Sequence, residues 1–463
     1  MKPSRTRAMA VLCGLLVPVV CYGQSTLSFP RVMQPQDFKT TGFAIVNPNP
    51  TSATITYTLY GEDGGVQLTT TQTVPLRGQL ARLASELFPT ATGTGWVQAT
   101  SAAPGLEGFW FGGDFATYAD GAEAATSSSE LVLPLINRSS EIDIANTGTT
   151  DVTIRLNIIG TDGFDLAEPF PQRIAAKGFF KGDLASIFPT VEDPSLATHM
   201  RVVCACAGPS AFAATVIARD FIVGPSWAVE NGVPASSSAT TLYFPYVVEG
   251  PQGTTTWTSV LGLTNLSTTS SNQVTATFTP QTGGSPRINR QTLPPNGAVR
   301  FSAHDWFGIT DFQTGWVSVT STLPLTGFVA YADLVAAGVA VVPPQQDPQP
   351  KLLFAHIADL APLGTGLALL NPTNTPANID VFAFTPSGTL IGTTSFPLAA
   401  ASNISKLLRE LIPQTQTRTS DGGFVFVRST TPIFGIELFF SRDSRYFGNV
   451  PAGPGNTFVP PAP

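Results

Sequence analysis

The sequence predicts an all-β protein of four tandem immunoglobulin-like β-sandwich modules in an elongated array. Three observations lead to this prediction. Similar segments recur four times along the 463 residues. Most of these segments alternate apolar and polar residues, the pattern of half-buried strands. Turn signals rich in Gly, Asp or Pro separate them, whereas helical periodicity is almost absent.

Each module opens on a similar strand and then reaches an apolar strand that ends in asparagine. An Asn side chain in this place can bond backbone groups two residues further on, so we expect these residues to fix a turn. The opening segments begin at Leu27, Leu131, Leu242 and Leu352. The asparagines are Asn47, Asn146, Asn265 and Asn371.

The second half of each module repeats as well. A short apolar segment predicts a single helical turn that stops at or near Pro or Gly, and these segments begin at Leu83, Leu184, His304 and Leu407. A closing hairpin then ends in aspartate, at Asp114, Asp220, Asp333 and Asp443, with spacings of 106, 113 and 110 residues. Such spacing predicts duplication of a complete folding unit, because solenoid repeats are about 20 to 45 residues long.

The predicted organisation is a signal peptide over 1–23 followed by four modules. The modules are expected over 24–128, 129–238, 239–348 and 349–463, and the last one carries a Pro-rich C-terminal tail. Stretches of small, polar and proline residues that begin at Gly121, Pro234 and Val341 are predicted linkers. Because Pro-rich links are semi-rigid, we expect limited bending between modules.

The N-terminus predicts export. Three basic residues precede an apolar run of 13 residues, Ala8 to Val20, which is typical of a secretory signal peptide. A membrane-spanning helix needs about 20 residues, so we expect a secreted or cell-surface protein, extracellular or periplasmic, with no transmembrane segment. Cleavage is expected near Gly23. Val20 before Cys21 disfavours the alternative of a lipid anchor.

Charge and cysteine content limit the kinds of partner and of site that the protein could have. Removal of the signal peptide leaves 21 Lys and Arg against 31 Asp and Glu, and this acidic balance disfavours nucleic acid as a partner. The two cysteines beyond the signal peptide, Cys204 and Cys206, would share one face of a strand. We favour two small core residues, with a strained redox pair or a soft-metal site as alternatives.

The Asn-Pro strand ends, the alternating strands around Gly turns and the Trp-Val hairpins at Trp96 and Trp316 resemble the immunoglobulin-like sandwich repeats of bacterial secreted and surface proteins. The resemblance implies roles in adhesion, spacing and display. It brings no catalytic, cofactor or metal residues with it. The chain differs from antibody-type domains because it lacks their Cys, Trp, Cys framework.

Every candidate site residue has a structural interpretation that we favour. The recurring aspartates would cap turns, with calcium binding at module junctions as the alternative. Isolated acids in turns are usually solvated, although a pair in a cleft could hydrolyse glycosides; those considered are Glu62, Asp63 and Asp305. His199, His304 and His356 lie in separate contexts, and nucleophile elbow, phosphate loop and dinucleotide motifs are missing from the sequence. We therefore predict no catalytic, cofactor or metal site.

The tryptophans distinguish the remaining hypotheses. Trp96 and Trp316 recur at one hairpin position and are expected in the core, while module 2 has Val202 there and is the most diverged. Aromatic side chains that do not recur could stack on sugars, and these are Trp110, Trp227 and Trp257. The leading hypothesis is a non-enzymatic extracellular structural, scaffold or adhesion protein with a protein or polysaccharide surface as partner. The alternatives are a carbohydrate-binding secreted protein and a hydrolase on one diverged module.

Overall fold

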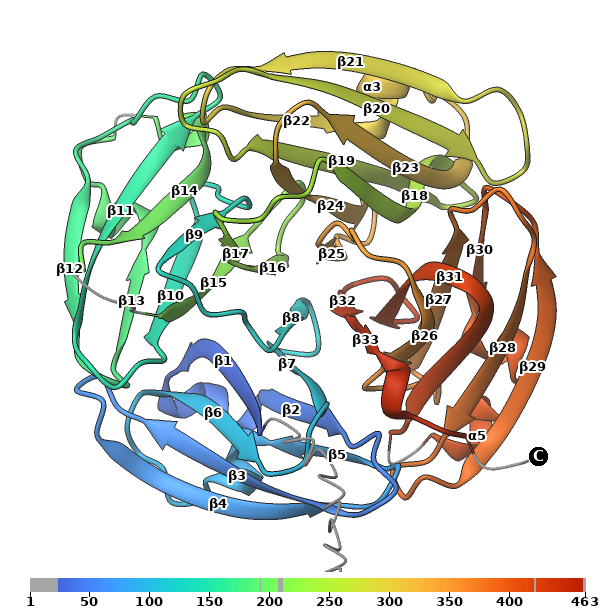
Figure 1. Ribbon diagram of the computed structural model, residues 1–463, viewed down its shortest axis with the longest axis horizontal. Coiled ribbons are helices and arrows are strands. Elements are labelled where there is room, and N and C mark those ends of the chain that lie inside the picture. Colours follow the sequence, from blue (N-terminus) through green and yellow to red (C-terminus); the bar gives the residue numbers. More distant parts are fainter. Residues whose placement is uncertain (1–23, 192, 207–210, 420–421, 461–463) are drawn as a thin grey trace, which may run out of the picture.

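The computed structural model describes residues 24–191, 193–206, 211–419 and 422–460, so the predicted signal peptide lies outside the described residues. Antiparallel strands make up most of these residues, and this confirms the all-β sandwich prediction. The sandwiches follow one another around a closed ring, as Figure 1 shows. None of the described helices is both long and apolar enough to cross a membrane.

Modules 1 and 2 each consist of two sheets. The elements of module 1 are β1 (Ser25–Met33), η1 (Pro35–Lys39), β2 (Thr41–Val46), β3 (Ala53–Tyr60), β4 (Val66–Val74), β5 (Gln79–Leu83), α1 (Ala84–Leu87), β6 (Gly95–Ser101), β7 (Glu107–Gly113) and β8 (Ala119–Glu123). Those of module 2 are β9 (Glu130–Leu133), β10 (Ser140–Asn146), β11 (Val152–Gly160), β12 (Phe170–Ile174), β13 (Phe179–Asp183), α2 (Leu184–Ile187), η2 (Pro194–Leu196), β14 (Ala197–Cys204), β15 (Phe212–Arg219), β16 (Trp227–Asn231) and β17 (Val233–Pro234).

Modules 3 and 4 repeat the plan, but in each of them one long element joins the two sheets. Module 3 contains β18 (Thr241–Gln252), β19 (Thr255–Asn265), β20 (Asn272–Pro280), β21 (Arg287–Leu293), β22 (Ala298–Ser302), α3 (Ala303–Phe307), β23 (Gln313–Ser321), β24 (Leu325–Asp333) and β25 (Val339–Val342). Module 4 contains β26 (Gln349–Phe354), β27 (Leu363–Asn371), β28 (Ala377–Phe384), β29 (Leu390–Leu398), β30 (Ser402–Leu407), α4 (Leu408–Leu411), α5 (Thr415–Arg418), β31 (Phe424–Ser441), β32 (Phe447–Val450), β33 (Ala452–Pro454) and η3 (Gly455–Thr457). The predicted single helical turns are confirmed as α1, α2, α3 and α4.

The two sheets of a module face in opposite directions around the ring. We name the sheet that faces the next module the forward sheet and the other one the back sheet. In module 1 the forward sheet has the order β1-β6-β3-β4 and the back sheet β5-β2-β7-β8. Apolar side chains between the two sheets form the core of each module, with Phe29, Ile55 and Val97 fully buried in module 1.

The recurring asparagines fix the same turn in every module, as the sequence predicts. Asn265 is fully buried, and its Nδ2 donates to the carbonyls of Ser270 and Pro294 at 2.9 and 2.8 Å. Its Oδ1 accepts the N–H of Ser267 at 3.1 Å. The equivalent contacts occur at Asn47, Asn146 and Asn371. Each side chain therefore joins a strand end to the turn that enters an edge strand of its back sheet.

At three of the four junctions, neighbouring modules meet through one repeated contact, in which a glycine turn of one module lies on a backbone turn of the next. Gly64 of module 1, Gly163 of module 2 and Gly388 of module 4 have φ values of 80°, 86° and 81°. A Cβ on these residues would lie 1.8, 2.0 and 2.5 Å from the carbonyl oxygens of Ala176, Pro295 and Arg77. Only glycine fits this approach. Because Arg77 belongs to module 1, the same contact that joins modules 1 and 2 also joins module 4 back to module 1.

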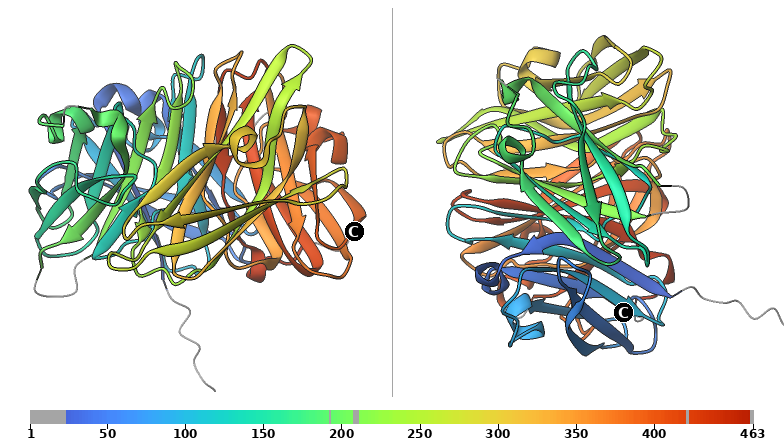
Figure 2. Two further views of the ribbon diagram at one scale, coloured as in Figure 1. Left: turned by 90° about the horizontal axis from the view of Figure 1, so that it is seen from above. Right: turned by 90° about the vertical axis from the view of Figure 1, so that its left-hand side faces the viewer.

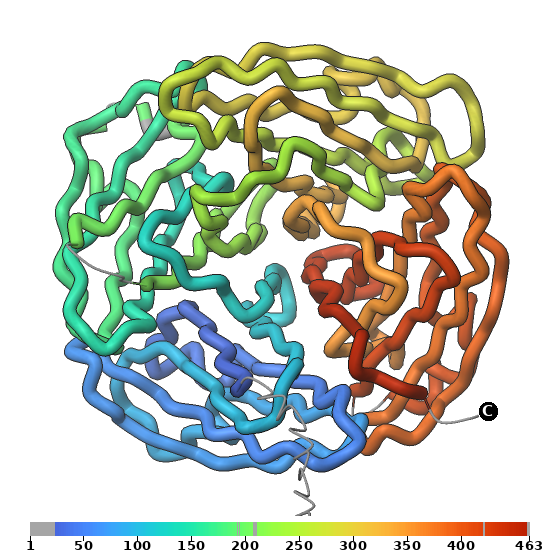
Figure 3. The backbone as a smooth tube through the Cα atoms, in the orientation of Figure 1, coloured from blue at the N-terminus to red at the C-terminus, as the bar shows by residue number. Residues whose placement is uncertain are grey.

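Ring closure corrects the predicted elongated arrangement. The backbone N–H of Gln79 donates to the carbonyl of Pro386 at 2.9 Å, and its Nε2 donates to that of Ala355 at 2.7 Å. The rings of Phe111 and Phe439 lie 5.1 Å apart across the same boundary. Figure 3 shows the first module, in blue, beside the last module, in orange and red, at this boundary. The modules are therefore parts of one compact particle.

The predicted linkers are corrected as well, because two of them begin inside buried strands. Gly121 and Ala122 are buried in β8, and Val341 and Val342 are buried in β25. These strands belong to a group of four, one from each module, that surrounds the ring axis: β8, β16, β25 and β32, which we name the axial strands. Each axial strand contacts the axial strands of both neighbouring modules.

A single carboxylate lies among the axial strands. Asp120 is fully buried and accepts the N–H groups of Gly121 and Val229, each at 2.8 Å. The backbone amides of Val341 and Asn449 also stabilise its charged form. Pairing within the back sheets shows that the four amides are equivalent, because their residues lie opposite Phe111, Ile217, Ala330 and Leu438. One side chain of module 1 thus binds an axial strand of every module.

The other modules have a small residue where module 1 has Asp120. Their equivalent residues are Ala228, Ala340 and Gly448. A Cβ on Gly448 would lie 1.9 Å from the ring of Phe111, so this position leaves no room for a larger side chain. Burial raises the pKa of Asp120 well above its usual value, and the four amides oppose this rise.

The closed ring predicts a compact particle in solution. A single compact domain of this size has a radius of gyration of about 22 Å, and we expect small-angle X-ray scattering on the chain from residue 24 to give a value near it. Limited proteolysis should leave the chain uncut near Gly121 and Val341. A larger radius together with release of single modules would contradict the ring.

Substitution of a recurring asparagine should destabilise the fold. In Asn265→Ala the carbonyls of Ser270 and Pro294 and the N–H of Ser267 lose their partner. We expect the free energy of unfolding, measured by urea denaturation, to fall by about 2 kcal/mol. The matched control is Asn378→Ala on β28, whose side chain is exposed, and this change should stay within about 0.5 kcal/mol. Equal stability of the two variants would argue against the role of Asn265.

Removal of the axial carboxylate should loosen the ring. Asp120→Ala leaves four buried amides without an acceptor. We expect the free energy of unfolding to fall by at least about 3 kcal/mol and the radius of gyration to increase. Added formate should restore part of the melting temperature of this variant and leave the wild-type protein unchanged, since a small carboxylate can occupy the vacated space. Asp347→Ala is the control, because Asp347 is exposed. A variant as stable as the wild type would show that the axial strands hold together without Asp120.

Candidate functional site

Three of the four junctions share the glycine contact, which junction 3–4 lacks because Gly283 has nothing within 4 Å, and all four differ in their side chains. In each of them, four equivalent positions on the facing sheets determine the character of the boundary. Junction 1–2 has Arg31, Glu141, Lys181 and Arg219; junction 2–3 has Leu135, Val260, Arg300 and Ala332; junction 3–4 has Tyr246, Gly366, Ser405 and Phe440; and junction 4–1 has His356, Gly42, Ala81 and Gly113. The boundaries therefore differ in the space and the chemical groups that they could offer to a ligand.

Junction 1–2 is held by a buried ionic network. Arg31 is 3% exposed and pairs with Asp143 at 3.2 Å, with Asp37 at 3.3 Å and with Glu141. Lys181 pairs with the same two module 2 acids. Burial opposes the charge of Arg31, but these three carboxylates outweigh it and raise its pKa. Because each charge has an opposite partner, the network serves to bind module 1 to module 2.

A polar cavity of about 310 Å³ opens beside this network. Trp227 lies on its wall, half-buried, and stacks on Tyr118 with ring centroids 4.9 Å apart. The guanidinium carbon of Arg31 lies 5.4 Å from the Trp227 ring. Both faces of this indole are thus in contact with protein groups, which leaves little of it for a ligand.

Junction 2–3 is filled by a continuous apolar core. The guanidinium of Arg300 lies 5.6 Å from the rings of both Phe221 and Phe328 and donates to the carbonyl of Pro134 at 3.3 Å. Burial lowers the pKa of Arg300 to about 10.

Strand pairing places His199, and not Val202, at the position of Trp96 and Trp316. Trp96 pairs with Tyr60, and His199 pairs with the equivalent Ile159. Both Trp96 and His199 lie in the forward sheet against the next module, where the Trp96 indole donates to the carbonyl of Lys177 at 2.8 Å. Burial lowers the pKa of His199 to about 3. These recurring side chains are buried, as expected. They lie at the junctions between modules, however, and not in the cores of the modules.

Junction 4–1 is apolar and narrow. His356 is half-buried and lies near Phe109 and Phe439, with centroid distances of 6.0 and 5.6 Å. Its Nδ1 lies 3.3 Å from Nε2 of Gln79, and burial lowers its pKa to about 4. The adjoining cavity measures about 250 Å³. This histidine is neutral at ordinary pH and forms part of the ring closure.

Junction 3–4 alone combines a wide cleft with aromatic walls among the described boundaries. The cleft measures about 500 Å³. Its aromatic residues are Tyr246, Trp257, Phe312, Tyr331, Phe440 and Phe447. Trp257 is half-buried and lies 5.6 Å from Phe447 between ring centroids, while Phe312 is 36% exposed. Aromatic faces are therefore available to a ligand at this boundary.

Two features keep this cleft open. Gly366 and Ser405 stand where junction 1–2 has Glu141 and Lys181, so small side chains replace an ion pair. The β18–β19 hairpin carries Gln252 and Trp257 over the cleft, and Figure 2 shows it projecting from one face of the ring. Its tip turns at Gly253, which has a φ of 62°.

Polar groups lie around the aromatic walls. Lys406 and Glu410 are exposed at the rim and lie 3.9 Å apart, so their charges compensate each other. Burial raises the pKa of Tyr246 to about 12, which keeps its hydroxyl protonated beside Ser405. Gln252 and Thr314 add an amide and a hydroxyl. The cleft thus offers hydrogen bonds without a net charge.

The recurring aspartates divide into two pairs. Oδ1 of Asp114 accepts the N–H groups of Ala116, Thr117 and Tyr118 at 2.8 to 3.0 Å. Partial burial acts against its ionisation, but the hydroxyl of Thr117 and these amides lower its pKa to about 2. Asp333 caps its turn in the same way.

Asp220 and Asp443 are exposed, and Asp443 pairs with Arg445 at 3.0 Å. The described residues hold no group of three or more His, Cys, Asp or Glu that could bind a metal ion, so nothing supports the calcium alternative.

The remaining candidates do not come together. Glu62, Asp63 and Asp305 are exposed in separate turns or helix starts, and His304 pairs only with Asp305 at 3.1 Å. Cys204 and Cys206 are half-buried and joined by a disulfide with Cα atoms 5.2 Å apart, so the interpretation as unlinked core residues is wrong. Trp110 is fully buried in the core of module 1 and is not available for stacking.

Comparison with known proteins assigns this chain to no family. No family model matches the chain, and no curated protein matches it. A tetra-tandem repeat from the extending region of a large adhesion protein is 12% identical over 91% of this chain and 96% of its own, with a TM-score of 0.11. Thermotoga maritima 1070 is 15% identical over 24% of this chain and 96% of its own, with a TM-score of 0.21.

A β-glucuronidase of Bacteroides uniformis is 9% identical over 52% of this chain and 26% of its own, with a TM-score of 0.13. Likenesses at these scores carry no argument about function.

Proposed function

We propose that this protein is an exported, non-enzymatic carbohydrate-binding protein, in which a rigid ring of sandwiches presents the cleft of junction 3–4 to a polysaccharide. The observation that carries the proposal is Trp257, half-buried in an aromatic cleft of about 500 Å³. Binding clefts of about 300 to 1,000 Å³ are typical of small-molecule sites. The proposal unites the scaffold hypothesis with the carbohydrate alternative.

The chemistry of the cleft suits a neutral sugar. The C–H faces of a pyranose pack on aromatic rings, and its hydroxyl groups need donors and acceptors at the edge. Trp257 and Phe312 supply the faces, whereas Gln252, Ser405 and Thr314 supply the edge groups. Since Lys406 and Glu410 compensate each other, a charged ligand gains little here.

The hydrolase alternative finds no support in this cleft. Glycoside hydrolysis needs two carboxyl groups about 5 to 9 Å apart. Among the described residues that line the cleft, Glu410 is the one carboxylic acid. Binding without cleavage is therefore the activity that this chemistry favours.

Trp257→Ala tests the proposal. A panel of soluble polysaccharides in affinity gel electrophoresis, with cellulose and chitin pull-downs, should identify at least one glycan that retards the wild-type protein. We expect the variant to bind it about tenfold more weakly, because the indole supplies the main stacking face. Phe164→Ala is the aromatic control, since Phe164 is 72% exposed in module 2, far from the cleft in sequence, and it should bind like the wild type.

Two results would overturn the proposal. One is the failure of every polysaccharide in the panel to bind the folded wild-type protein. The other is binding that Trp257→Ala leaves unchanged. Release of reducing sugar during the binding assay would instead favour the hydrolase alternative.

A further inference from the structure

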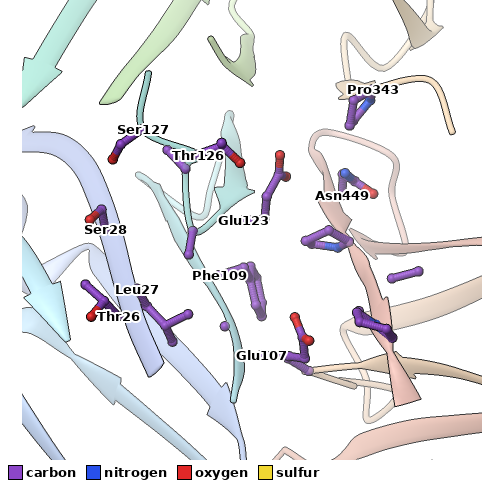
Figure 4. A pocket seen from close by; sticks show the side chains of 18 of the residues that line it. Thr26, Leu27, Ser28, Glu107, Phe109, Glu123, Thr126, Ser127, Pro343 and Asn449 are labelled. Carbon is purple, nitrogen blue, oxygen red and sulfur yellow. The ribbon is translucent and has the colours of Figure 1, made fainter. Parts of the chain in front are cut away.

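A second cavity of about 680 Å³ lies below the axial strands, where residues of all four modules meet. Module 1 contributes most of its wall, and Thr147, Gln345 and Asn449 come from modules 2, 3 and 4. Figure 4 shows Glu107, Glu123, Phe109 and Asn449 around this space. Thr126 and Ser127 are exposed at its edge, so solvent reaches it. It adjoins the cleft of junction 3–4, with Ile436 in the wall of both, but the two share no other lining residue.

The wall of this cavity is acidic. Glu107 and Glu123 are the two ionisable residues among the described residues that line it, and no lysine, arginine or histidine joins them there. A Cβ on Gly453 would lie 2.4 Å from the carboxyl carbon of Glu107, so a bare backbone in β33 makes room for this side chain. No hydrogen bond or ion pair from another described residue reaches the Glu107 carboxylate.

The neighbouring charges do not neutralise these acids. Glu230 lies close enough to Glu123 for the two carboxylates to repel each other, and both oxygens of Glu230 are buried without a partner. The ammonium group of Lys177 binds two residues of the wall, Oε1 of Gln98 at 3.1 Å and the carbonyl of Thr147 at 2.7 Å, and pairs with neither glutamate. Burial raises the pKa of Glu107 to about 7 and raises that of Glu123 as well. The empty cavity thus disfavours both negative charges.

An independent observation indicates a missing ligand. Asn449 is 3% exposed and lines the cavity, and its Oδ1 has no hydrogen-bond partner. A buried carbonyl oxygen without a donor destabilises the protein. Carboxylates and a free amide oxygen are all acceptors, so the group that satisfies them must donate hydrogen bonds and carry positive charge. Phe109 adds an aromatic ring, which also attracts cations.

We propose that this cavity binds a small organic ammonium compound, with Glu107 and Glu123 as its counter-ions and Asn449 as a hydrogen-bond acceptor. A metal ion fits less well, because the described residues provide no group of three ligating side chains. The size of the cavity admits an amine of several carbons. The amine's N–H groups supply the donors that Glu107 and Asn449 lack, and they add to the Asn231 side chain that already stabilises the charged form of Glu123.

A matched pair of probes tests the inference. Isothermal titration calorimetry with the full chain should show binding of 1,4-diaminobutane and at least tenfold weaker binding of 1,4-butanediol, which has the same shape without the charge. Glu107→Gln and Glu123→Gln should each weaken binding of the diamine at least tenfold. Glu62→Gln removes the same charge from an exposed turn of module 1 and should bind like the wild type.

Each outcome decides the question. Equal affinity for the diamine and the diol, or no binding of the diamine by folded protein, overturns the inference. The same holds if Glu107→Gln and Glu123→Gln, shown to be folded by their melting temperatures, bind the diamine unchanged. Trp257→Ala should leave diamine binding intact, so this test succeeds or fails independently of the carbohydrate proposal.

Discussion

The position of Asp120 constrains the whole ring. Its buried carboxylate collects four equivalent backbone amides, one from each module. Those amides can meet at one point only if the axial strands surround it at similar distances, which sets how the modules tilt and how far they stand from the axis. Charge-assisted hydrogen bonds in a buried site are among the stronger ones in proteins. The junctions then need only fill the space between sheets whose positions are already fixed.

This division of roles explains why the junctions differ so much. Ion pairs between charged side chains join modules 1 and 2, and an apolar core joins modules 2 and 3. An aromatic cleft separates parts of modules 3 and 4, and His356 closes the boundary of modules 4 and 1. Because no single boundary carries the ring alone, one of them can lose packing and gain a cleft. The candidate ligand sites lie where the packing is least complete.

Local signals in the sequence were enough to predict the modules. The recurring asparagines, the single helical turns and the capping role of Asp114 and Asp333 depend on residues close together in the chain, and the structure confirms them. Ring closure depends on contacts such as that of Gln79 with Ala355, 276 residues apart, which repeats and periodicity do not reveal. Asp120 lies just before a stretch whose small residues resemble a linker, although their size is what close approach at the axis requires. His199 was missed because apolar strands can be aligned in more than one register, and only pairing partners decide between them.

The single aspartate among three small residues has a consequence for how such a ring can be assembled. If module 1 existed as a separate chain and four copies formed the ring, each copy would bring its own Asp120 to the axis. Four carboxylates would then compete for four amides in a buried space, and their mutual repulsion would open the assembly. Four copies of module 2 or module 3 would bring alanine instead and leave the amides without an acceptor. The arrangement thus requires unlike modules in a fixed order, and a covalent chain guarantees that order, so this axis belongs to a fused polypeptide and not to a symmetric oligomer.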